Sequence, residues 1–170
     1  MPLPRPHFIH NQILKNIWLG WETFKETSNA KFGISFLGID VIIDKKRFLP
    51  DLFAMTDKSR LHDSYYSGAP TLVVQVQTPP TAKYNLTVKK DLYEKGGVKE
   101  YWVVSPEEQS LTVWKNVGGK LEIAAYMRVP PSDTSIDDYD EYTTLYTTDV
   151  LGQGLQVDIW EIFDSTKDLL

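Results

Sequence analysis

The chain has 170 residues, 42% of them hydrophobic and 24% charged, a composition typical of a globular domain and not of a disordered or fibrous protein. It contains no cysteine, which excludes disulfides and thiolate metal sites and is expected of a protein in the reducing cytoplasm. The formal net charge of -5 argues against binding nucleic acid over the whole surface but allows a local basic face, and no segment reaches the roughly 20 apolar residues of a membrane span.

The first third of the chain predicts one helix and two strands. Apolar residues at helical spacing indicate an amphipathic helix over about residues 8–26. Residues 32–43 read as extended, the polar residues 44–46 as a hairpin turn, and residues 48–55 as a second strand. Pro50 is most easily placed at the start of that second strand or at a sheet edge, since it cannot donate a backbone hydrogen bond.

The middle of the chain predicts a strand–helix–strand unit. A β-branched run at residues 71–77 is bounded by prolines, as expected of a central strand. Residues 81–95 show helical periodicity, with Thr81 as the expected cap and Gly96-Gly97 as the stop. Residues 98–105 then form another apolar run. Two strands joined through a helix are expected to be parallel.

The last third predicts β-hairpins and a closing helical turn. The expected elements are a hairpin of strands 111–114 and 121–127, a polar loop at 130–140, short strands at 145–148 and 155–157, and a helical turn at 159–163. No repeat or linker divides the chain, so we interpret residues 1–170 as a single α/β domain.

Several kinds of catalysis are excluded by the residues that the chain lacks. Without cysteine there is no thiol nucleophile, and no nucleophile-elbow pattern supports a serine triad. His7, His10 and His62 fall in segments predicted to be terminal or irregular, so a histidine metal site is not expected. No glycine-rich phosphate loop precedes a helix. Carboxylates and lysines remain as the candidate reactive groups.

Asp51 and Lys89 are the candidates among them. Carboxylates at neighbouring strand ends can hold Mg²⁺, which lowers the pKa of bound water, and a nearby lysine can stabilise the charge that develops on a phosphate. Asp51 begins a predicted strand, and Lys89 lies on the predicted crossover helix. From the residues alone, an ordinary turn residue and a surface cation explain the two better than a catalytic role does.

Three segments resemble the Uma-two family of restriction endonucleases. They are Pro70-Thr-Leu-Val-Val-Gln-Val-Gln-Thr-Pro79, Gly97-Val-Lys-Glu-Tyr-Trp-Val-Val-Ser-Pro106 and Phe48-Leu-Pro-Asp-Leu-Phe53. Gly-Val-x-Glu-Tyr-Trp is the most specific motif, and the resemblance extends over most of the chain. It implies a restriction-endonuclease-like fold, which is a mixed central sheet flanked by helices, here with β-hairpins in the C-terminal half. It also implies Mg²⁺-dependent cleavage of DNA, in the manner of PD-(D/E)XK nucleases.

The resemblance assigns roles to individual residues and also shows departures. Asp51 matches the metal-binding aspartate and Lys89 the catalytic lysine borne on the helix. Gln75 stands where the metal-binding glutamate is expected, so its neutral carbonyl oxygen would hold a hard cation less well. Asn85 replaces an aspartate before the helical lysine, and Thr71 replaces the aspartate that follows the proline of the central strand. The implied metal site, Asp51 with Gln75, is therefore impaired.

Two functions follow from this pattern. The first is a metal-dependent endonuclease that hydrolyses phosphodiester bonds of DNA, with a basic rim formed by Lys83, Lys90 and Lys99. The second is a catalytically inactive domain of the same fold that serves as a binding or interaction module.

Two further hypotheses concern residues outside this site. Glu22 or Glu26 could replace a glutamate that the family has before its first helix, although a solvated helix face is the favoured explanation for both. A homodimer could use aromatic residues, with Trp18 and Trp21 or the pair Tyr65-Tyr66 as candidates, although core positions explain these as well.

Overall fold

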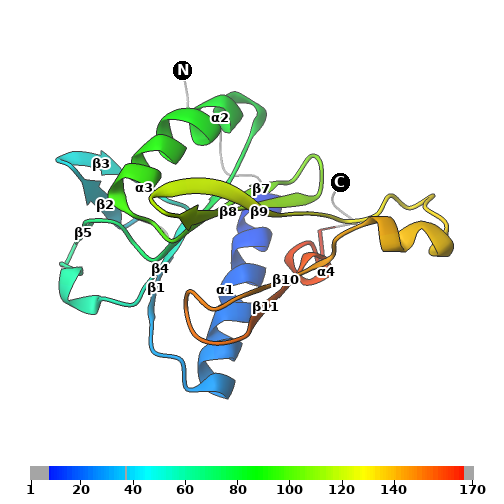
Figure 1. The fold of residues 1–170 in the computed structure, drawn as a ribbon, viewed down its shortest axis with the longest axis horizontal. Coiled ribbons are helices and arrows are strands. Elements are labelled where there is room, and N and C mark those ends of the chain that lie inside the picture. The colour runs from blue at the N-terminus through cyan, green and yellow to red at the C-terminus, as the bar shows by residue number, and fades with distance from the viewer. Residues whose placement is uncertain (1–7, 37, 167–170) are drawn as a thin grey trace.

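The structure is a computed structural model that describes residues 8–36 and 38–166. Its centre is a six-stranded mixed sheet with the strand order β1-β4-β6-β7-β8-β9 (Figure 1). The strands are β1 Gly33–Phe36, β2 Asp40–Ile43, β3 Lys46–Phe48, β4 Leu52–Met55, β5 Tyr65–Ser67, β6 Leu72–Val76, β7 Glu100–Ser105, β8 Ser110–Val117, β9 Lys120–Arg128, β10 Leu145–Thr148 and β11 Leu155–Asp158. The helical elements are α1 Phe8–Ser28, η1 Lys58–Arg60, α2 Pro79–Tyr84, the π-helical turn η2 Asn85–Lys89, α3 Lys90–Gly96, η3 Ile136–Glu141 and α4 Ile159–Ile162.

The predicted strand–helix–strand unit is confirmed at the centre of the sheet. Strands β6 and β7 are parallel, with Leu72 opposite Glu100 and Val76 opposite Val104. All other neighbours in the six-stranded sheet are antiparallel. Because β4 runs antiparallel to β6, the first residues of β4 lie beside the last residues of β6. Side chains from the two neighbouring strands therefore lie close together at this end of the sheet.

One face of the sheet is covered by α1 and by the C-terminal elements. Ile13 and Trp21 on α1 are buried against sheet residues such as Val74 and Trp102. The rings of Trp21 and Trp102 meet edge to face, with their centroids 5.7 Å apart. The apolar stripe predicted for the first helix is therefore the surface that packs on the sheet.

The opposite face carries the helical crossover and a small three-stranded sheet with the order β3-β2-β5 (Figure 1). Val41 on β2, Tyr66 on β5 and Tyr93 on α3 pack there against Val73 and Tyr101 of the large sheet. The mixed sheet is thus buried on both sides, which explains why its central strands are mostly apolar, with Gln75 in β6 and Glu100 in β7 as buried polar residues.

The prediction of two long strands at 32–43 and 48–55 is wrong, because each stretch is divided between the two sheets. Gly38 has a φ of +86°, which is accessible to glycine, and it separates β1 in the large sheet from β2 in the small one. Pro50 lies between β3 and β4, and it interrupts the strand because it has no N–H to donate. The predicted turn at residues 44–46 is confirmed in its position between β2 and β3.

The predicted helix at 81–95 is longer and carries an irregularity. It begins at Pro79, and Thr78 and Thr81 bond reciprocally as a capping box, so Thr78 and not Thr81 is the N-cap. The π-helical turn η2 adds one residue to a helical turn, and this moves the inward position from Leu86 to Asn85. Asn85 is accordingly buried, while Leu86 is exposed.

Two glycine-to-alanine substitutions are expected to change stability in opposite directions. A Cβ on Gly96 would lie 2.9 Å from Ile43 Cγ2, so Gly96→Ala should lower the free energy of unfolding by about 1–3 kcal/mol through overpacking. Gly20, inside α1, has nothing within 4 Å of such a Cβ, so Gly20→Ala should raise it by about 0.5–1 kcal/mol. Chemical denaturation of both variants checks the pair, and a stabilised Gly96→Ala variant would contradict this packing.

Among residues 8–36 and 38–166, no helix is long and apolar enough to cross a membrane.

Candidate functional site

Asp51 lies at the sheet end where β4 begins and β6 finishes. Its Oδ2 accepts a hydrogen bond of 2.8 Å from the backbone N–H of Val76. The register pairs Leu52 with Val74, so one more step along the strands brings Asp51 opposite Gln75. The carboxylate is thus fixed by the neighbouring strand, with about a quarter of the side chain (23%) exposed to solvent.

Gln75 and Lys89 are in direct contact across the gap between β6 and the helical crossover. The Lys89 ammonium donates a hydrogen bond to Gln75 Oε1, and the Gln75 amide donates to the carbonyl of Val74 at 3.3 Å. Gln75 is buried, whereas Lys89 is half-buried with its ammonium 5.8 Å from the centre of the Tyr84 ring. The π-helical turn ends at Lys89, and such turns occur often at functional sites.

Two opposing influences act on the pKa of the Lys89 ammonium. Burial lowers the pKa of its ammonium, and the nearby carboxylate of Asp51 opposes this shift. Asp51 also contributes to the raised pKa values of Tyr93 and Tyr101, although burial is the larger cause for both. Asp51 therefore acts electrostatically on Lys89 and on both tyrosines.

His10 is a fourth polar residue of this site, and the sequence interpretation missed it. It lies in the first turn of α1, and its Nε2 is 3.5 Å from Asp51 Oδ1. The helix predicted over residues 8–26 already included His10, but its position 41 residues before Asp51 gave no indication that the two side chains meet. His7 lies outside the described residues, and His62 stacks on Tyr65 with ring centroids 4.3 Å apart.

These side chains do not fit a tightly held Mg²⁺. Magnesium prefers carboxylate oxygens and water in an octahedral arrangement. Here one carboxylate is committed to a backbone N–H and faces an imidazole, while the amide oxygen of Gln75 already accepts from the Lys89 ammonium. Within the part of the chain that the structure describes, no group of three or more His, Cys, Asp or Glu side chains is placed to hold a metal ion.

The other departures from the family pattern lie outside this contact network. Asn85 is buried, and its amide donates to Thr81 at 3.4 Å. Thr71 sits at the opposite, amino-terminal end of β6, where its hydroxyl accepts from the N–H of Thr56. Neither residue is hydrogen-bonded to Asp51, Gln75 or Lys89 within the described chain, so the lost charge that bears most directly on the site is the one at Gln75.

Glu22 and Glu26 are too far along α1 to complete the site. Each residue adds about 1.5 Å to a helix, so Glu22 lies roughly 18 Å from His10 along the axis. Glu22 pairs with Lys25 at 3.3 Å, and Glu26 is exposed. Both therefore agree with the alternative of a solvated helix face.

The expected basic rim is only partly near the site. Lys83 is exposed on α2, but Lys90 contacts Glu94 at 3.7 Å and lies over the Trp114 ring. Lys99 belongs to a separate hollow of about 580 Å³, at the end of the parallel strands opposite to Gln75.

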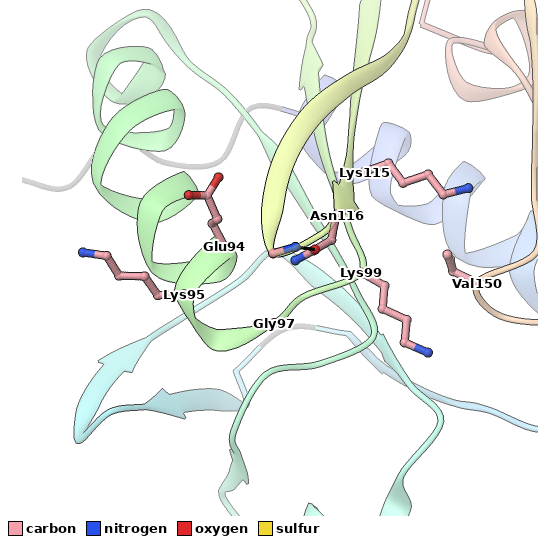
Figure 2. Close-up of a pocket in the computed structure, with 8 residues that line it drawn as sticks. Glu94, Lys95, Gly97, Lys99, Lys115, Asn116 and Val150 are labelled. Atoms are coloured by element: carbon pink, nitrogen blue, oxygen red, sulfur yellow. Dashed lines mark hydrogen bonds between the residues drawn. The ribbon is translucent and has the colours of Figure 1, made fainter.

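Charged side chains of both signs and apolar surface line the hollow. Figure 2 shows Lys99 and Lys115 extending to the side of the hollow on which Val150 lies, whereas Lys95 points away in the opposite direction. Glu94 extends above it, and its carboxylate accepts hydrogen bonds from Lys120 and from the N–H of Leu121. Those bonds engage the Glu94 carboxylate, which is the only carboxylate that lines the hollow among the described residues.

The aromatic residues considered for a dimer are divided between core and surface. Trp21 and Tyr66 are buried core residues. Trp18 remains 37% exposed beside Phe36, with ring centroids 6.4 Å apart, and Tyr65 is partly exposed. Of these four aromatic residues, Trp18 and Tyr65 are therefore the ones accessible to a second copy of the chain.

Comparisons with known proteins agree with the resemblance seen in the sequence. Residues 1–142 match the Uma2 family, described as "Putative restriction endonuclease". A crystal structure from Anabaena variabilis ATCC 29413, described as a "putative nuclease belonging to DUF820", superposes with a TM-score of 0.70. The two chains are 14% identical, and the match covers 96% of this chain and 84% of that one. No curated protein matches. The family match spans most of the chain and the fold agrees with that of the nuclease, so the chain belongs to the Uma2 family of restriction-endonuclease-like proteins.

Proposed function

We propose that this chain is an endonuclease that hydrolyses phosphodiester bonds of DNA, with a metal dependence impaired by Gln75. The observation that carries the proposal is the convergence of Asp51, Gln75 and Lys89 at one end of the central strands. They come from the start of β4, the end of β6 and the helical crossover, which are the positions that the family resemblance assigns to the site.

The residues present suggest a division of labour. Lys89 would lie against a phosphate oxygen and stabilise the negative charge that develops during hydrolysis. Asp51, fixed by the Val76 N–H, would orient the reacting groups together with the neighbouring His10. Asp51 and Gln75 are the proposed metal positions, and their single negative charge predicts that Mg²⁺ binds weakly.

A second candidate function is a binding or interaction module that does not cleave. It is favoured by the way the site is satisfied by its own residues. The Gln75 oxygen accepts from Lys89, and both Asp51 oxygens face protein groups. A site closed in this way can be retained for the stability of the fold after its chemistry has been lost.

We propose in addition that the chain works as one domain in the cytoplasm and that a homodimer would form through Trp18 or Tyr65. The absence of cysteine agrees with a reducing compartment.

Nicking of supercoiled plasmid in the presence of Mg²⁺ or Mn²⁺ tests the choice between the two functions. The unaltered chain is expected to nick slowly, and Lys89→Ala is expected to lose about 100-fold or more of this activity, as for removal of a group that stabilises the transition state. Lys95→Ala, which removes an exposed lysine from the same helical segment, is the matched control and should retain it.

Two results would reject the endonuclease. One is an unaltered chain that is inert with both ions, which would favour the non-cleaving module. The other is nicking that persists equally in the Lys89→Ala variant, which would place any activity elsewhere or in a contaminant.

A further inference from the structure

Gln75 changes the net charge of the site, and this has a consequence for binding. The formal charges of Asp51, Gln75 and Lys89 are negative, neutral and positive, so the three residues together are neutral. A glutamate at position 75 would leave the group with one excess negative charge. That charge would repel a phosphodiester, which is itself an anion, unless a cation lay between them.

The Lys89 ammonium is the only one of the three groups with a positive charge, and it is held in place. It donates to Gln75 Oε1, a neutral acceptor that orients the ammonium without neutralising it. An ammonium has three N–H donors, so further donors are available to a ligand. Its position over the Tyr84 ring limits its freedom further, and a fixed cation loses less entropy when an anion binds.

The negative charge nearby is already engaged. Asp51 accepts from the Val76 N–H through one oxygen and faces His10 with the other. Lys89 is also half-buried, and a partly desolvated ammonium gains more from an anionic partner than an exposed one does. These features favour an incoming anion at Lys89.

We propose that the Lys89 ammonium, oriented by Gln75, takes the place of a divalent cation, and that this site binds a DNA phosphodiester without metal. The inference rests on the proposed function, which names DNA as the substrate, and it separates the binding of DNA from any metal-dependent cleavage. In this view Gln75 is the residue that lets the site receive a phosphate in the absence of metal.

Fluorescence anisotropy with a labelled DNA duplex tests the proposal, in EDTA and in Mg²⁺ at matched ionic strength. The unaltered chain is expected to bind equally well in the two buffers. Lys89→Met, which keeps an unbranched side chain of similar size but removes its charge, should weaken binding about tenfold or more in both. Gln75→Glu should weaken binding about tenfold in EDTA and recover it in Mg²⁺, because the added carboxylate then has a cation beside it.

Two matched controls separate this site from the overall charge of the protein. Lys95→Met removes one exposed positive charge and Gln153→Glu adds one negative charge, each outside the Asp51–Gln75–Lys89 group. Both should change the affinity less than about threefold. Thermal unfolding of every variant shows whether it is folded at the assay temperature.

Three outcomes would overturn the inference. Binding that appears only with Mg²⁺ would overturn it and leave the metal-dependent endonuclease standing. Binding in EDTA that Lys89→Met leaves unchanged would place the DNA elsewhere on the chain. No binding in either buffer would overturn both the inference and the assignment of DNA as the substrate.

Discussion

Replacing Glu100 by alanine is expected to lower the free energy of unfolding by about 3–5 kcal/mol. Glu100 is fully buried at the start of β7, and its carboxylate accepts three hydrogen bonds. The donors are Trp102 Nε1 at 2.9 Å, the Tyr146 hydroxyl at 2.8 Å and the Thr148 hydroxyl at 2.6 Å. Alanine would leave these donors without a partner and open a cavity, and each unsatisfied buried group costs about 1–3 kcal/mol.

The Glu100 bonds also connect distant parts of the chain. Tyr146 and Thr148 lie on β10, so the carboxylate fastens the C-terminal hairpin to the central sheet. Burial, and next the charge of Glu100, raise the pKa of the Tyr146 hydroxyl, which therefore stays protonated and remains a donor at neutral pH. The loss of Glu100 should consequently expose β10 and β11 to faster hydrogen exchange than the rest of the sheet.

Urea denaturation measures the Glu100→Ala effect, with two comparison variants. Glu100→Gln keeps the shape but replaces one acceptor oxygen by an N–H₂ group, so it should lose about 1–3 kcal/mol. Glu107→Ala removes an exposed carboxylate from the turn after β7 and should change stability by less than about 0.5 kcal/mol. A Glu100→Ala variant as stable as Glu107→Ala would show that the three bonds contribute nothing to the fold.

Changing Gln75 to glutamate is expected to create measurable metal binding where the unaltered chain has little. The substitution adds a carboxylate opposite Asp51, so two negative charges face the site across one positive charge on Lys89. Proteins usually bind Mg²⁺ through one or two carboxylates together with water, so the second carboxylate should strengthen binding. We expect Mn²⁺ and Mg²⁺ to bind about 100-fold more tightly, which corresponds to about 2.7 kcal/mol.

Isothermal titration calorimetry with Mn²⁺ measures this gain, and plasmid nicking shows whether activity rises with it. Gln153→Glu, in an exposed turn, adds the same charge and should leave the metal affinity unchanged. Asp51→Asn combined with Gln75→Glu should remove most of the gain, since one carboxylate is then lost again. A Gln75→Glu variant that binds Mn²⁺ no better than the Gln153→Glu control would contradict the assignment of Asp51 and position 75 as a metal pair.

The sequence alone identified the strand–helix–strand unit and the residues that it carries. The apolar run of β6, the Gly96-Gly97 stop and the apolar run of β7 are local patterns, and each was found within a few residues of its place. The same is true of α1 and of the hairpin formed by β8 and β9. These elements follow from periodicity and from turn residues, which depend only on neighbours along the chain.

Only the tertiary structure decided which side chains meet at the site. His10 and Asp51 are 41 positions apart, and their contact exists because α1 packs on the sheet with its first turn at the end where β4 begins. The π-helical turn could not be read from a 3.6-residue period, and it is what buries Asn85 and exposes Leu86. The division of residues 32–55 between two sheets depends in the same way on long-range pairing of strands. Local periodicity therefore determined the elements, whereas packing between distant segments determined the geometry of the site.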